Sequence, residues 1–74
     1  MPMTMQEWRD SNAVADSAAE AFRDVLRLVD APERTLNSVR GAASHKGEAL
    51  VHVGHLAADV VERLAERVRR GTPL

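Results

Sequence analysis

A stripe of apolar residues at helical spacing runs along the first third of the chain. Trp8, Ala15, Phe22 and Val29 recur every seven residues, and charged residues lie largely off this stripe. This arrangement is typical of an amphipathic helix that buries one face. The pattern predicts a helix over about residues 5–29.

Local signals mark both ends of this helix. Thr4 and Glu7 have the spacing of a capping box, in which two side chains satisfy the free amides of a first helical turn. Pro32 cannot donate an amide and restricts the residue before it, so the helix should end there. A short helical turn is expected over residues 31–36. Ser11-Asn12, two poor helix formers on the stripe, form the weakest point of the long helix.

Residues 38–55 allow two interpretations. In the first, residues 39–43 and 49–53 are two strands, with Gly47 supplying the left-handed residue of a short hairpin loop. The β-branched residues of 51–53 favour it. In the second, Ser44 caps one helix over about residues 45–70, whose apolar residues keep helical spacing. Gly47 and Gly54 count against that helix, since each costs about 1 kcal/mol relative to alanine.

Both interpretations predict a helix over residues 57–70. Asp59–Arg63 and Glu66–Arg70 are i,i+4 pairs in the favourable order. Gly71 follows, which is typical of a helix end. We expect an α+β fold in the order α-β-β-α, with both helices on one face of the hairpin. The alternative is an all-α antiparallel helical hairpin that forms a dimeric four-helix bundle.

Length and composition narrow the class of protein. The 74 residues form a single expected domain, 1–74, with a thin core. The chain has no cysteine, so a disulfide cannot stabilise it and association is the expected aid. No apolar run suits a signal peptide or a membrane span. We therefore expect a soluble, cytoplasmic protein; its arginine and alanine bias is typical of a GC-rich bacterial genome.

No group of residues has the pattern of a catalytic, cofactor or metal site. His52 and His55 would point to opposite faces of a strand, and zinc needs three or four ligands. Ser44 beside His45 is better explained as turn chemistry. The sequence contains no nucleophile elbow and no phosphate-binding glycine pattern. We expect no enzyme activity, no cofactor, no metal and no small-molecule substrate.

Arginines of the C-terminal helix suggest one binding function. Arg63, Arg67 and Arg70 fall on one side of that helix and could contact phosphates. Acidic residues are interleaved with them, and the formal net charge is −1, so a basic face is not formed. A weak nucleic-acid-binding module is the alternative function.

The apolar stripe suggests the leading function. The long helix outruns its predicted partner helix, so part of the stripe, above all Trp8, needs another chain to cover it. We expect a small interaction or regulatory module that acts through a homodimer or another protein. The expected interface residues are Trp8, Ala15, Phe22 and Leu50.

Overall fold

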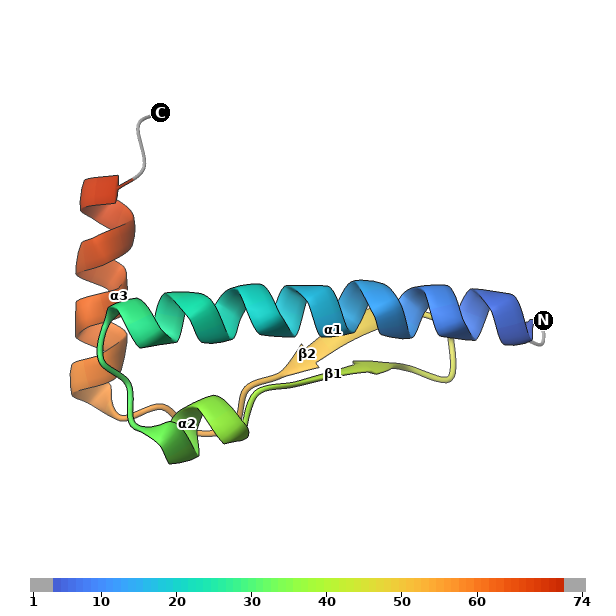
Figure 1. Ribbon diagram of the computed structural model, residues 1–74, viewed down its shortest axis with the longest axis horizontal. Coiled ribbons are helices and arrows are strands. Elements are labelled where there is room, and N and C mark those ends of the chain that lie inside the picture. Colours follow the sequence, from blue (N-terminus) through green and yellow to red (C-terminus); the bar gives the residue numbers. More distant parts are fainter. Residues whose placement is uncertain (1–3, 72–74) are drawn as a thin grey trace.

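The computed structural model describes residues 4–71 and contains three helices and one antiparallel hairpin (Figure 1). In chain order the elements are α1 (Met5–Leu28), α2 (Glu33–Asn37), β1 (Arg40–Ala43), β2 (Ala49–His52) and α3 (Ala58–Gly71). The order α-β-β-α is as predicted, with α2 as the short turn after Pro32. Across residues 4–71 no helix has the length and apolar character needed to cross a membrane.

Helix α1 begins and ends with standard caps. The Thr4 hydroxyl accepts a hydrogen bond from the Glu7 amide at 3.1 Å, as the sequence predicts. At the other end Asp30 takes a left-handed conformation, with φ 58°. The Asp30 and Ala31 amides then donate to the carbonyls of Arg27 and Leu26, which is the Schellman arrangement. The helix is unbroken at Ser11 and Asn12.

The hairpin pairs Gly41 with Val51 and Ala43 with Ala49. Its loop is closed by the Ser44 amide, which donates to the Glu48 carbonyl at 2.9 Å. Gly47 has φ 87°, the left-handed conformation predicted for the loop. Gly54, after β2, has φ 76°. The alternative of one helix over residues 45–70 is wrong, because neither glycine has helical backbone angles.

Close contact between α1 and β1 holds the hairpin in place. A Cβ atom on Gly41 would lie 2.4 Å from the backbone carbon and oxygen of Ala15, so only glycine permits this approach. Ala15 and Ala19 are buried. The core continues toward the C-terminal end of α1, where residues from several elements form one cluster: Ala19, Leu26, Val29, Leu36, Val39 and Val60.

The position of α3 differs from the prediction. It crosses the C-terminal end of α1 (Figure 1) instead of lying with α1 on the hairpin face. Val60 is its only buried residue, and Leu64 is half-buried. The physical reason is the link from β2: Gly54 turns the chain sharply, and α3 starts beside α2 and the end of α1. Much of its apolar face, including Val61 and Val68, is therefore exposed.

Candidate functional site

The outer edge of β1 is covered by side chains of α1. The Asn12 side-chain oxygen accepts a hydrogen bond from the Ala43 amide at 3.3 Å, and its nitrogen donates to the Trp8 carbonyl at 3.0 Å. Arg23 donates to the Val39 carbonyl, just before β1. These contacts satisfy backbone groups that an edge strand otherwise leaves open.

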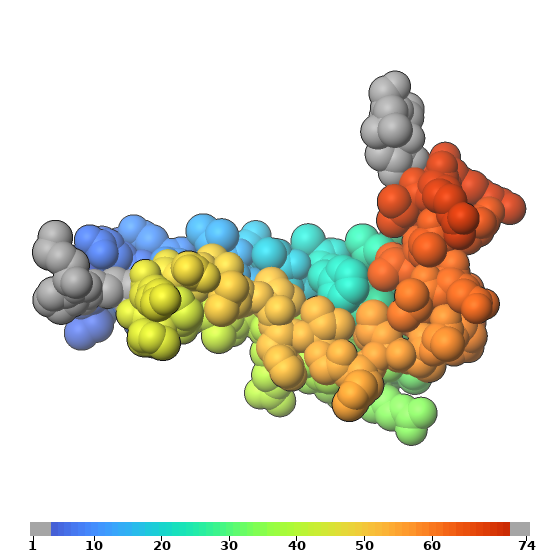
Figure 2. Space-filling model, turned by 180° about the vertical axis from the view of Figure 1, so that it is seen from behind, coloured from blue at the N-terminus to red at the C-terminus, as the bar shows by residue number. Residues whose placement is uncertain are grey.

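The outer edge of β2 has no such cover. Along an antiparallel ladder, hydrogen-bonded residue pairs alternate with pairs that are not hydrogen-bonded. Ser44 and Glu48 are a hydrogen-bonded pair, so the neighbouring pair of Ala43 and Ala49 is not. The amides and carbonyls of Ala49 and Val51 therefore point away from β1. Within residues 4–71 these outward groups have no hydrogen-bond partner. Figure 2, which shows the molecule from behind, has the hairpin lying uncovered beside α1.

The face of the hairpin turned away from α1 is also open. Side chains alternate along a strand, so this face carries Arg40, Ala42, Leu50 and His52, and all four are exposed. Leu50 retains 49% of its accessible surface. An exposed leucine beside an open strand edge is the combination that proteins usually avoid or cover.

A second apolar stripe runs along α1 and stays largely exposed. It consists of residues at i, i+4, i+7 spacing: Val14, Ala18, Ala21, Val25 and Leu28. Val14 is 61% exposed and Leu28 is 59% exposed. At 3.6 residues per turn, this stripe lies roughly 170° around α1 from Asn12 and Arg23. Because those two residues reach the outer edge of β1, the stripe lies on the flank of α1 nearer to β2.

The four predicted interface residues lie in different environments. Trp8 is 47% exposed and Leu50 is also exposed. Ala15 is buried inside the chain against Gly41, so it has no surface to offer another chain. Phe22 is half-buried and packs against the core cluster. Trp8 and Leu50 are the two exposed residues of the four, and Phe22 keeps part of its surface accessible.

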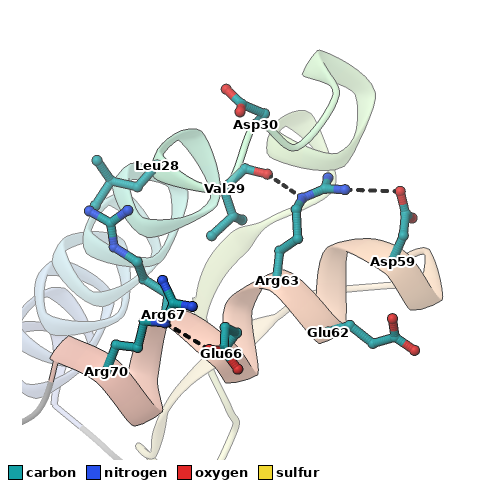
Figure 3. A pocket seen from close by; sticks show the side chains of 9 residues that line it. All are labelled: Leu28, Val29, Asp30, Asp59, Glu62, Arg63, Glu66, Arg67 and Arg70. Carbon is teal, nitrogen blue, oxygen red and sulfur yellow. Dashed lines mark hydrogen bonds and ion pairs between the residues drawn. The ribbon is translucent and has the colours of Figure 1, made fainter.

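The three predicted nucleic-acid-binding arginines lie together at the corner between α1 and α3. They line an open hollow of about 430 Å³ with Leu28, Val29 and Asp30 (Figure 3). Arg63 donates to the Val29 carbonyl at 2.8 Å and to Asp59 at 3.1 Å. Arg70 is paired with Glu66 at 2.7 Å. Within residues 4–71, Arg67 is the one member of the three without an ion pair.

Two serines, Ser44 and Ser11, serve local structure. The Ser44 hydroxyl accepts hydrogen bonds from the Lys46 and Glu48 amides, which is the predicted turn chemistry. The Ser11 hydroxyl donates to the Gly47 carbonyl at 2.7 Å and so ties the loop to α1. Among residues 4–71, no three side chains of histidine, cysteine, aspartate or glutamate are grouped so as to hold a metal ion.

The sequence predicts that a two-stranded hairpin has open edges, which could pair edge to edge across a dimer, but it does not identify which edge stays open. The open edge of β2 depends on which edge α1 covers, and no residue of β2 itself signals that. The second stripe of α1 has a signal, since Val14 to Leu28 repeat at helical spacing beside the first stripe. No protein-family model matches the chain, and comparisons with curated proteins and with solved structures give no match either.

Proposed function

We propose that this protein is a small interaction or regulatory module that acts by presenting an apolar surface to another protein chain. The observation that carries the proposal is that three open features lie at and around the outer edge of β2, on both faces of the hairpin. These are the outer edge of β2, the exposed Leu50 and the exposed stripe of α1. Exposed apolar residues beside an unpaired strand edge are typical of protein-interaction sites.

Two further features support an interaction surface over an active site. The hollow at the corner of α1 and α3 is open and lined by arginines whose charges are mostly paired with carboxylates on the same helix. Leu50 and Val14 instead lie on regular elements, β2 and α1, which hold an apolar surface rigidly for a partner. We place this module in the cytoplasm, without catalysis, cofactor or small-molecule substrate.

A weak nucleic-acid-binding module is the second candidate, and one observation favours it. Arg67 projects into the hollow without an ion pair among residues 4–71 (Figure 3). Arg63 contacts Val29 and Asp59, and Arg70 is paired with Glu66. A phosphate that binds these two arginines would have to displace those contacts. Binding of this kind weakens steeply with salt, whereas association through an apolar surface does not.

A photo-crosslinking amino acid at Leu50 tests the leading proposal in living cells. A discrete protein adduct is expected from that position, since Leu50 is 49% exposed beside the open edge of β2. The matched control is the same amino acid at Asp16, which is exposed on the opposite side of α1 from the stripe. Adducts that form equally from both positions, or from neither, would contradict the proposal.

A further inference from the structure

We infer that the occupant of the open β2 edge is a second copy of this chain, bound by antiparallel pairing of β2 with β2 around Leu50. This inference rests on the proposed function and names its partner. The two hairpins then form one sheet in the order β1-β2-β2-β1. A two-fold axis passes between the two Leu50 residues, as expected for a self-complementary interface.

The backbone determines which registers are allowed. In an antiparallel pair, residues whose amides and carbonyls point toward the new strand must face one another. On the outer edge of β2 these are Ala49 and Val51. Symmetric registers can therefore be centred on residue 49, 50 or 51. Centring on Leu50 places Ala49 opposite Val51 of the second copy, with four backbone hydrogen bonds between them.

Side chains select the register centred on Leu50. In this register Leu50 lies opposite Leu50 of the second copy. Glu48 lies opposite His52 of the second copy, so a carboxylate acceptor meets an imidazole donor on each side of the axis. Centring on residue 49 places Glu48 opposite Leu50. Centring on residue 51 places Leu50 opposite His52. Only the first register makes both a like apolar pair and a complementary polar pair, and such cross-strand pairs stabilise sheets.

The helices fit the same arrangement. A two-fold axis perpendicular to the sheet keeps both copies of α1 on one face. Strands are about 4.8 Å apart, and α1 lies closest to β1, where Ala15 contacts Gly41, so the two copies of α1 lie roughly 10–14 Å apart, a gap that their side chains span. The flank of α1 nearer to β2 carries the exposed stripe, and its larger side chains, Val14 and Val25, face the second copy of α1. Val14 is nearest to the axis, because Asn12 contacts Ala43 and Ala15 contacts Gly41.

The decisive variant is Ala49→Pro. It removes one outward amide at the first residue of β2 and leaves the ladder between β1 and β2 intact, where proline is tolerated. Sedimentation at micromolar concentration should show a dimer for the natural chain and a monomer for Ala49→Pro. Ala49→Val, which keeps the amide, is the matched control and should remain a dimer. In the natural chain, the Ala49 and Val51 amides should become protected from hydrogen exchange as concentration rises.

Charge exchange tests the register and remains informative if Ala49→Pro fails to fold. Glu48→Lys should raise the dissociation constant by about three- to tenfold, because each dimer contains the pair twice. Adding His52→Glu should restore it. A natural chain that stays monomeric, or a folded Ala49→Pro variant that stays dimeric, would overturn the inference. In either case a specific crosslink from Leu50 to another protein would leave the proposed function standing.

Discussion

At Gly41 the absence of a side chain lets β1 lie directly on the backbone of α1. An added Cβ would meet the carbon and oxygen of Ala15 at 2.4 Å, and a helix backbone cannot yield as a flexible side chain can. Gly41→Ala should therefore lower the free energy of unfolding by about 1–3 kcal/mol, as overpacking does. Urea denaturation measures the change. The control is Gly71→Ala, where a Cβ meets nothing within 4 Å; an equal loss there would remove the steric explanation.

Asp30 shows the opposite case, a side chain where glycine fits better. Its left-handed backbone, with φ 58°, is unfavourable for residues with a Cβ atom. Asp30→Gly should raise the free energy of unfolding by about 0.5–1 kcal/mol, since glycine suits the position after a helix end. Thermal denaturation checks the sign. Asp30→Ala separates charge from conformation, because it removes the carboxylate but keeps the Cβ atom and should give no such gain.

The side chain of Asn12 joins α1 to β1 through hydrogen bonds. Helix propensity alone predicts that Asn12→Ala stabilises α1. The structure predicts the reverse: Asn12 bonds the Ala43 amide and the Trp8 carbonyl, and losing such bonds costs about 1–2 kcal/mol. Chemical denaturation and hydrogen exchange at the Ala43 amide should both show the loss. Ser17→Ala is the control, an exposed position of α1 that should gain slightly.

Elements were easier to predict than their contacts. Caps, glycines and periodicity are local signals, so the bounds of α1, the hairpin and α3 follow closely from the sequence. The position of α3 depends on the left-handed turn at Gly54 and on Leu36 and Val39 reaching the core cluster, which are long-range facts. The same limit applies to the site. Trp8 and Leu50 were expected at an interface, but Ala15 belongs to the contact with Gly41.

Two adjacent valines of α3 differ in burial, one lying in the core and the other at the surface. Val60 is 1% exposed in the core cluster, and Val61 is 45% exposed. Val60→Ala should lower the free energy of unfolding by about 1–3 kcal/mol through lost burial and a cavity. Val61→Ala removes the same methyl groups at the same helix and should change stability by less than about 0.5 kcal/mol. Equal effects in urea denaturation would mean that α3 packs against α1 through a different face.

For the whole molecule, shape and stability are linked through association. The described residues extend 42 Å along their longest axis and only 16 Å along the shortest. An elongated chain of this size buries a limited core, and its exposed apolar flank is on the side of the open strand edge. Binding of a second copy would bury more apolar surface without changing the fold of either chain. The melting temperature of the natural chain should then rise with protein concentration, as linkage between folding and association requires.

Val14 gives the sharpest test of this linkage, because it is 61% exposed in the single chain and lies nearest to the proposed axis. Val14→Glu should leave the dilute protein as stable as the natural chain but abolish the rise in melting temperature with concentration, since two carboxylates would face each other across the axis. Ala13→Glu places the same charge on the polar flank of α1 and should behave like the natural chain. Trp8 lies roughly 9 Å along α1 from Val14, so Trp8→Ala should weaken association less than Val14→Glu. A reversed order would move the interface to the N-terminal end of α1 and away from β2.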